Sequence, residues 1–260
     1  METKNGLSRR NLLAALTAAA AASRAKQALA AAAGDKANVP VISKRVEKLF
    51  LGPGKEPNAL QCVSDGLWIL DQEDPNKVHK VRYEDGSVMV ELQTESYHGS
   101  GITYGNGALW IASTGKLKTL KVDPATGKTL KSFDTPGVGP IKWGKDHHVS
   151  GAHGMEWVDG KYWIAVPPSV VIYLIEPETG QIIRSIPAPG VRPHGLAWDN
   201  GYLWCVESND RAIYKLDPKD GRPVAKIQLT RQDPEPHGLS IRGGVLWYSD
   251  ASSRWISKLV

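Results

Sequence analysis

Three histidines occupy one position in successive copies of a short pattern, His-Gly-Met or His-Gly-Leu. They are His153, His194 and His237, and each lies ten residues before a tryptophan. Three imidazoles that arrive from adjacent strands around a narrow axis can hold a divalent metal ion and leave a position open for water or substrate. The residue types do not distinguish zinc, manganese, magnesium and iron. Histidines that only bond channel water are the alternative interpretation.

Further histidines could move a proton beside such an ion. His98 lies two residues before Ser100, which has the equivalent position in an earlier copy of the pattern, where Asn58 occupies the first copy. An insertion from Gly137 to about Gly151 delivers two more histidines with other polar and aromatic residues: Trp143, Lys145, Asp146, His147 and His148. Because connecting loops often carry function, we expect a lid or catalytic loop here, with His98 or His148 as the proton-transfer residue; an ordinary exposed loop is the alternative.

Three carboxylates are candidates for supporting roles. Glu156 lies three residues after His153 and could act as a general base or orient a metal ligand. Strand alternation would put it off the face of His153. Glu207 and Asp250 each follow a repeat tryptophan by three residues and could line the channel deeper down.

The elements that must position these residues come from a repeat. A glycine followed by one or two residues and tryptophan recurs, with tryptophans at Trp68, Trp110, Trp163, Trp204 and Trp247, spaced by 42, 53, 41 and 43 residues. Three copies continue into a turn with proline and glycine, such as Asp123-Pro124-Ala125-Thr126-Gly127, and short alternating segments run between the turns. About 42 residues with four short strands is typical of one propeller blade. We expect the tryptophans to pack between blades rather than to form a stacking platform.

The ends of the chain predict how the ring closes. The fifth copy lacks its outermost strand, because the chain stops at Val260. Residues 46–53 upstream of the first copy read as a strand without a partner. We therefore predict an all-β fold, a single five-bladed β-propeller over residues 41–260, closed by this N-terminal strand pairing into the last blade. Cys62 and Cys205 fall in different copies, so we expect two buried free thiols rather than a disulfide.

The N-terminal segment carries most of the net charge of +5. Residues 1–33 hold five basic residues and one acidic residue, and without them the net charge is +1. Ser8-Arg9-Arg10-Asn11-Leu12-Leu13, an Ala-rich stretch and two small-residue cleavage patterns resemble a twin-arginine signal peptide, with Leu12 where that family usually has phenylalanine. The resemblance implies removal of residues 1–33, a partnership with the export machinery and a soluble periplasmic protein. We expect neither a permanent membrane anchor nor nucleic-acid binding.

The repeat itself resembles known families. The segment from His194 to Trp204, followed by Glu207, is similar to the repeat of virginiamycin B lyase and NHL-type propellers over nearly the whole mature chain. In that lyase family, histidine and acidic residues at the channel mouth work with a divalent cation to open a cyclic ester by elimination. The resemblance implies such roles for His237 and His194.

A weaker likeness is to bacterial glutaminyl cyclotransferases. It rests on Met155-Glu156-Trp157-Val158-Asp159-Gly160-Lys161 and on Ser113-Thr114-Gly115. His153-Gly154 stands where that family has Asn-Glu, and Ala112 stands where it has Glu, which weakens the transfer of its activity.

The sequence therefore favours an exported metal-dependent lyase or hydrolase. It would act at the central channel on a small substrate with a carbonyl, ester or carboxylate group. The metal ligands would be His153, His194 and His237, and His98, His148 and Glu156 are the candidate catalytic residues. The alternatives are a non-catalytic propeller that binds a ligand or a protein, and a glutaminyl cyclotransferase.

Overall fold

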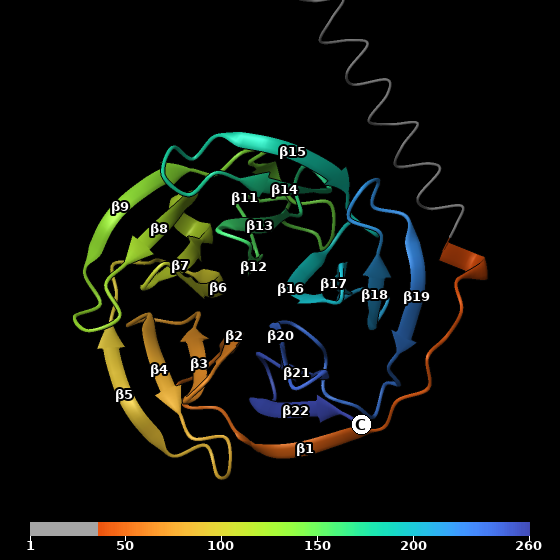
Figure 1. Ribbon diagram of the computed structural model, residues 1–260, viewed down its shortest axis with the longest axis horizontal. Helices are drawn as coiled ribbons and strands as arrows, with labels where there is room; N and C mark the ends of the chain where they lie inside the picture. Colours follow the sequence, from red (N-terminus) through yellow and green to blue (C-terminus); the bar gives the residue numbers. More distant parts are fainter. Residues whose placement is uncertain (1–35) are drawn as a thin grey trace, which may run out of the picture.

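The computed structural model describes residues 36–260, which form five four-stranded antiparallel sheets around a central axis (Figure 1). The signal-peptide prediction for residues 1–33 lies outside the described residues. Apart from the short 3₁₀ turns η1 (Lys36–Asn38) and η2 (Thr114–Lys116), the regular structure of residues 36–260 is β-strand. The prediction of an all-β, five-bladed propeller is confirmed. No helix in this part of the chain is long and apolar enough to cross a membrane.

Each blade runs outward from the axis, one strand after the next. Blade 1 contains β2 (Pro57–Val63), β3 (Gly66–Asp71), β4 (Lys77–Val81) and β5 (Val88–Gln93). Blade 2 contains β6 (Gly99–Gly105), β7 (Ala108–Ser113), β8 (Lys118–Val122) and β9 (Thr129–Asp134). Blade 3 contains β12 (Gly154–Val158), β13 (Lys161–Val166), β14 (Val171–Ile175) and β15 (Ile182–Pro187). Blade 4 contains β16 (Pro193–Asp199), β17 (Tyr202–Glu207), β18 (Ala212–Leu216) and β19 (Pro223–Gln228). Blade 5 contains β20 (Leu239–Arg242), β21 (Val245–Ser249), β22 (Trp255–Leu259) and β1 (Val46–Leu51).

The fifth blade is built from both ends of the chain. Strand β1 lies antiparallel to β22, from Val46 opposite Leu259 to Leu51 opposite Trp255. Arg45 and Val260 add two backbone hydrogen bonds of 2.8 and 3.0 Å at the end of this pair. The predicted closure is therefore confirmed.

The repeat tryptophans are the packing units between blades. All five are buried, with exposed fractions between 0% and 6%. Each apolar cluster joins residues of two neighbouring blades, as Trp163 of blade 3 does with Leu196 and Leu203 of blade 4. Burying about 200 Å² of aromatic surface is worth roughly 5 kcal/mol in transfer free energy. The expected packing role is confirmed.

The glycine that follows each of His153, His194 and His237 lets neighbouring inner strands approach closely. A Cβ atom on Gly154 would lie 1.9 Å from the carbonyl oxygen of His194, and one on Gly195 would lie 2.2 Å from the backbone nitrogen of Leu239. These contacts are with backbone atoms, which cannot rotate away. The glycines are therefore required by the convergence of strands at the axis.

Candidate functional site

Five equivalent residues gather where the inner strands begin, at one mouth of the channel. We call them the mouth ring: Asn58, Ser100, His153, His194 and His237. Strands β2, β6 and β16 have an irregular pairing at this position, for instance between Pro193 and Leu196. A β-bulge bends the strand and redirects a side chain. The bulges thus occur where mouth-ring side chains must be aimed at the axis.

The structure brings the three histidines together. The ring centroids of His153 and His194 lie 4.5 Å apart, and those of His194 and His237 lie 4.9 Å apart. Nδ1 of His153 and Nε2 of His194 share a hydrogen bond of 2.9 Å. The outer Nε2 of His153 lies 3.1 Å from the hydroxyl of Ser150.

Burial keeps these imidazoles uncharged at neutral pH. It lowers the pKa of His153 to about 3, with the nearby Arg192 guanidinium adding to the shift. It also lowers the pKa of His194 well below its usual value. The pKa of His237 is lowered by burial and by Arg192, although the Glu235 carboxylate acts in the opposite direction. Uncharged imidazoles can accept a proton, donate a hydrogen bond or bind a metal.

An arginine that the sequence analysis missed lies beside the histidines. Arg192 Nη1 forms an ion pair with Glu235 at 2.9 Å, and Nη2 donates to Nε2 of His237 at 3.3 Å. Nδ1 of His237 lies 3.3 Å from the carbonyl oxygen of Glu235 and donates to it. The guanidinium carbon also lies 5.9 Å from the Trp143 ring centroid. The mouth therefore contains a fixed positive charge.

A repeat signal for Arg192 was present in the sequence. The residues two positions before the mouth ring form an outer ring: Glu56, His98, Gly151, Arg192 and Glu235. Glu56, His98 and Arg192 line the same cavity. Aligning the repeats two residues before the mouth ring would have identified Glu56, His98 and Arg192 as equivalent positions.

The other half of the mouth contains amide side chains beside the carboxyl group of Glu56. Asn58 donates from Nδ2 to Gln72 and, at 3.2 Å, to the hydroxyl of Ser100. The Gln72 amide nitrogen in turn contacts Nε2 of His98. Burial lowers the pKa of His98, against the opposing effect of Glu73.

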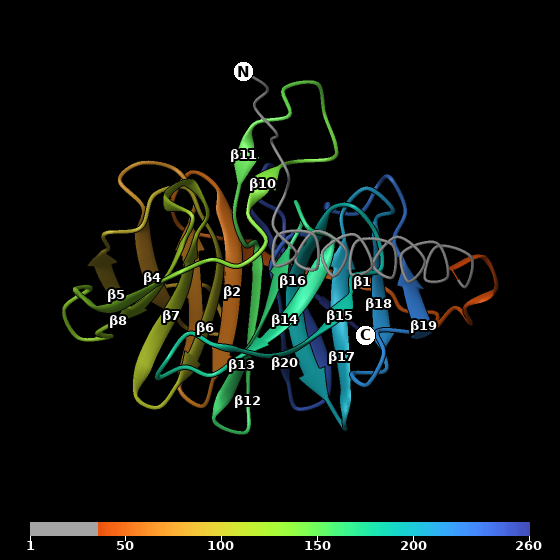
Figure 2. The same ribbon diagram turned by 90° about the horizontal axis from the view of Figure 1, so that it is seen from above.

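The insertion forms a hairpin that stands above the ring, with strands β10 (Gly139–Pro140) and β11 (Val149–Ser150) (Figure 2). Trp143 and His148 line the mouth cavity, which has a volume of about 220 Å³. The Trp143 ring meets the His153 ring edge-on, with centroids 5.7 Å apart. His147 is turned to its own hairpin, with Nδ1 3.1 Å from the carbonyl oxygen of Ile141. Neither Lys145 nor Asp146 lines the cavity.

Glu207 and Asp250 do not lie deeper in the channel, as the sequence had suggested they could. Oε2 of Glu207 accepts the backbone N–H of Arg192 at 3.0 Å, and Oδ2 of Asp250 accepts that of Glu235 at 2.9 Å. Asp71 in blade 1 accepts the backbone N–H of Glu56 in the same way, at 2.9 Å. These carboxylates hold the loops that carry the outer ring. Glu156 does not line the mouth cavity; it lies farther along β12.

The mouth histidines fit a divalent ion in donor type. The partners of His153 and His237 on Ser150 and on the Glu235 carbonyl are of the kind that orient metal-binding imidazoles. Two nitrogen ligands of a tetrahedral zinc ion lie about 3.3 Å apart, since each metal–nitrogen distance is about 2.0–2.1 Å. The corresponding separation is 2.9 Å for His153 and His194, and Arg192 faces Nε2 of His237. Within residues 36–260 no three His, Cys, Asp or Glu side chains are arranged to hold a metal. An ion at these three nitrogens would therefore require Arg192 to move away from His237.

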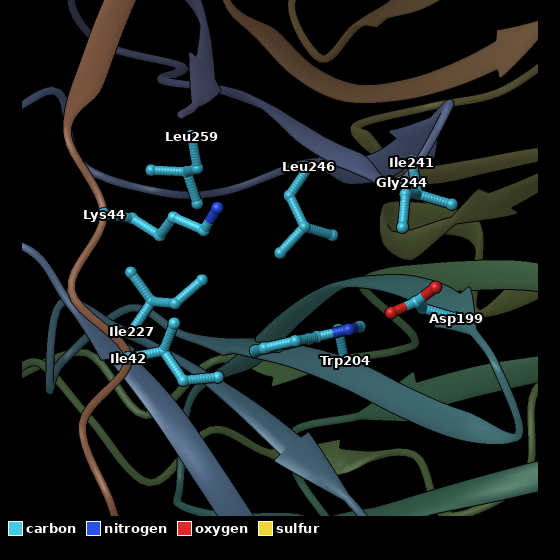
Figure 3. A pocket seen from close by; sticks show the side chains of 9 residues that line it. All are labelled: Ile42, Lys44, Asp199, Trp204, Ile227, Ile241, Gly244, Leu246 and Leu259. Atoms are coloured by element: carbon cyan, nitrogen blue, oxygen red, sulfur yellow. The ribbon is translucent and has the colours of Figure 1, made fainter.

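A second pocket, of about 190 Å³, lies between blades 4 and 5 under the N-terminal segment (Figure 3). Its walls are mainly apolar side chains, among them Ile42, Trp204 and Leu246, with Lys44 and Asp199 as the charged residues. It lacks the cluster of histidines that marks the mouth. We therefore place the candidate site at the mouth.

Both cysteines are free, as expected. Cys205 is fully buried and Cys62 is partly exposed. Burial raises the pKa of the Cys62 thiol to about 11 and that of Cys205 well above its usual value. Neither thiol is an activated nucleophile.

Comparison with known proteins supports the fold. No family model matches this chain, and no curated protein matches it in sequence. Among solved structures, glutaminyl cyclase from Myxococcus xanthus aligns with a TM-score of 0.66 at 10% identity, over 85% of this chain and 97% of that one. Virginiamycin B lyase from Staphylococcus aureus aligns with a TM-score of 0.50 at 16% identity, over 84% of this chain and 99% of that one. At these identities the likeness concerns the fold, and both resemblances noted from the repeat are confirmed at that level.

Proposed function

We propose that the mouth cavity is the active site of a lyase or hydrolase that acts on a small molecule with a carboxylate or ester group. The observation that carries this proposal is the meeting of Arg192 with three uncharged imidazoles in one cavity. Clusters of groups with perturbed pKa values in a concave site are typical of active sites. A volume of about 220 Å³ limits the substrate to a small molecule.

Arg192 is the anchor for the anionic group. A guanidinium offers two parallel N–H donors that match the two oxygens of a carboxylate. The ion pair of Nη1 with Glu235 and the hydrogen bond of Nη2 to His237 hold the guanidinium in place before a substrate binds. Trp143 forms a wall against which the rest of the substrate can pack.

His98 and His148 are the proton-transfer residues of this proposal. Both line the same cavity as the buried histidines. His98 is held uncharged by its environment and can take a proton from a carbon next to the carboxylate, or from a water that attacks an ester. His153 is a much weaker base, since its pKa is about 3. Its role here, and that of His194, is to shape the site and donate hydrogen bonds.

A divalent ion remains a separate proposal. Bound by His153, His194 and His237 it would supply Lewis acidity at the mouth. Arg192 would first have to leave Nε2 of His237, because it faces that nitrogen at 3.3 Å. No step proposed for the residues above depends on the ion.

Export to the periplasm is also a proposal, supported by the twin arginines Arg9 and Arg10 and the Ala-rich stretch after them. Its test is N-terminal sequencing of the protein recovered from a periplasmic fraction. We expect a start near residue 31 or 34. An intact Met1 terminus in the cytoplasmic fraction would exclude export.

The enzymatic proposal is tested with small probes. Saturation-transfer NMR with lactate, succinate and phenylacetate measures binding, with the corresponding amides as neutral controls. Arg192→Gln should weaken carboxylate binding more than tenfold, whereas Arg222→Gln, on an outer turn, should not. Incubation with hydroxy acids, esters and lactones, followed by ¹H NMR, tests turnover. Equal binding by both variants would overturn the site, and binding without any turnover would favour the non-catalytic propeller. Cyclisation of a glutaminyl peptide would favour the cyclotransferase instead.

A further inference from the structure

The mouth cavity contains two charges of opposite sign. Apart from histidines, the ionisable residues of the described chain that line it are Glu56 and Arg192. Glu56 directly precedes β2 of blade 1, and Arg192 directly precedes β16 of blade 4. Strand β20 of blade 5 lies between β2 and β16 around the axis (Figure 1). The two charged residues therefore come to the cavity wall from non-adjacent blades.

The backbone of Glu56 is fixed, whereas its carboxylate has no basic partner. Oδ1 of Asp71 accepts the Glu56 N–H at 2.9 Å, and the Glu56 carbonyl accepts the N–H of Gln72 at 2.9 Å. The ammonium group of the neighbouring Lys55 donates to the carbonyl oxygen of Asp74 at 3.0 Å. Among residues 36–260 the Glu56 carboxylate forms no ion pair, and the charges that act on it are those of other carboxylates. It is therefore available to a ligand.

The surroundings of Glu56 favour a positively charged ligand group. Burial raises the pKa of its carboxyl, and the nearby carboxylates of Glu73 and Asp71 raise it further. Glu56 is only partly buried, so water still solvates its charge at neutral pH. An ammonium group beside Glu56 would offset the repulsion from the other two carboxylates.

A buried amide two residues away lacks one hydrogen bond. Asn58 lines the same cavity with an exposed fraction of 2%, and its Nδ2 donates to the hydroxyl of Ser100 at 3.2 Å. Its Oδ1 has no hydrogen-bond partner within residues 36–260. A buried oxygen without a donor is unfavourable, and an ammonium group has three donors to offer. One ammonium group thus has enough donors for both Glu56 and Asn58.

We propose that the mouth binds a small amino acid as a zwitterion, with its carboxylate at Arg192 and its ammonium group at Glu56; this rests on the proposed function, in which Arg192 anchors a carboxylate. A simple carboxylate would be repelled by Glu56 in the same cavity, whereas an ammonium group on the same molecule is attracted to it. Because the two residues belong to non-adjacent blades, the site favours molecules whose charged groups stand apart, such as β-alanine and 4-aminobutyrate, over α-amino acids.

The test compares each amino acid with the carboxylate that lacks only its amino group. The pairs are 4-aminobutyrate with butyrate and β-alanine with propionate, and ligand-observed ¹H NMR titration at neutral pH measures the dissociation constants. Each amino acid should bind about tenfold more tightly than its partner, the effect expected of a hydrogen bond to a charged group. Butylamine, which has no carboxylate, should bind more weakly than 4-aminobutyrate.

Variants assign the preference to Glu56. Glu56→Gln keeps the size of the side chain and should remove the preference for amino acids, and Glu56→Asp should retain part of it. Glu84→Gln removes the same charge from an exposed turn and should leave the preference intact. Arg192→Gln should weaken the binding of amino acids and simple carboxylates alike. Urea unfolding shows whether each variant is folded.

Two results would overturn the zwitterion proposal and leave the active-site proposal standing. One is equal binding of butyrate and 4-aminobutyrate by the wild type, with both weakened in Arg192→Gln. The other is an undiminished preference for 4-aminobutyrate in Glu56→Gln. Binding of butyrate that is the same in the wild type and in Arg192→Gln would instead overturn the active-site proposal itself.

Discussion

The side chain of Glu207 holds the backbone of Arg192: Oε2 accepts the Arg192 N–H at 3.0 Å, and Oε1 lies 3.3 Å from it. Glu207 has an exposed fraction of 1% and lies at the end of β17, whereas Arg192 lies in the loop just before β16. The bond ties the loop with the anion-binding residue to a rigid strand of the same blade. Glu207 is thus a positioning residue for Arg192.

Glu207→Ala should therefore weaken carboxylate binding although Glu207 does not line the cavity. It leaves the buried N–H of Arg192 without an acceptor, which costs about 1–3 kcal/mol in stability. Glu207→Gln retains a carbonyl oxygen and should recover most of the binding. Titration of succinate by NMR, beside urea unfolding, separates the two effects. Loss of stability with unchanged affinity would reduce Glu207 to a structural role.

Ionisation of Glu207 should make the stability of the protein depend on pH. Burial raises the pKa of its carboxyl to about 7 in the folded protein, against 4.5 for an ordinary glutamate. The unfolded chain releases this proton first, so Glu207 lowers the free energy of unfolding as pH rises from about 4.5 to 7. Glu207→Gln cannot ionise, so its Tm relative to wild type should rise across that window. The difference at full effect is about 3 kcal/mol, since one pKa unit is worth about 1.4 kcal/mol.

Measuring Tm of both proteins at pH 5 and pH 8 checks this sign. The buried histidines raise the free energy of unfolding as pH increases. Below pH 6.5 histidines of the unfolded chain bind protons, whereas His153 in the folded protein stays unprotonated down to about pH 3. They are present in both proteins and cancel in the comparison. A Tm difference that is constant or falls between pH 5 and pH 8 would contradict the assignment.

Removal of Arg192 should strengthen metal binding at the mouth, if the three histidines hold an ion. The guanidinium faces Nε2 of His237 at 3.3 Å and repels a cation there. Arg192→Ala should therefore bind zinc at least tenfold more tightly than wild type, and His194→Ala should bind it least. Equilibrium dialysis with elemental analysis measures both. Equal zinc affinity in the arginine variant and wild type would argue against an ion at these three nitrogens.

Both thiols should be slow to react in the folded protein. The pKa of Cys62 is raised to about 11, and Cys205 is fully buried. Because the thiolate is the reactive form, a disulfide reagent at pH 8 should label the native protein slowly and label two thiols in urea. Fast labelling of one thiol without denaturant would show that Cys62 is more accessible than its surroundings indicate.

The repeat in the sequence was enough to predict the blades, the closure by β1 and the place of the histidines. These depend on glycine, proline and tryptophan at fixed spacing, which local turn chemistry and packing require. Arg192 was missed because it lies in a loop, where only the repeat frame marks it. Glu156 was kept as a candidate catalytic residue although strand alternation argued against it, and the structure places it outside the mouth cavity, farther along β12. The irregular pairings in β2, β6 and β16 could not be predicted from alternating apolar and polar residues, because that pattern does not show where a strand bulges.

The glycines of the His-Gly pairs should be intolerant of alanine, because the neighbouring strand occupies the space. In Gly195→Ala the new methyl carbon would lie 2.2 Å from the backbone nitrogen of Leu239 and 2.6 Å from the carbonyl oxygen of His237. Relieving that overlap moves β16 from β20 and breaks the bond from the Gly195 N–H to the His237 carbonyl, which is 2.8 Å long. We expect a loss of about 3 kcal/mol or more, at the upper end of overpacking effects. Gly139→Ala, whose nearest neighbour would be 3.8 Å away, is the matched control. Urea unfolding of both variants measures the difference, and a Gly195→Ala protein as stable as the control would disprove the close approach of the inner strands.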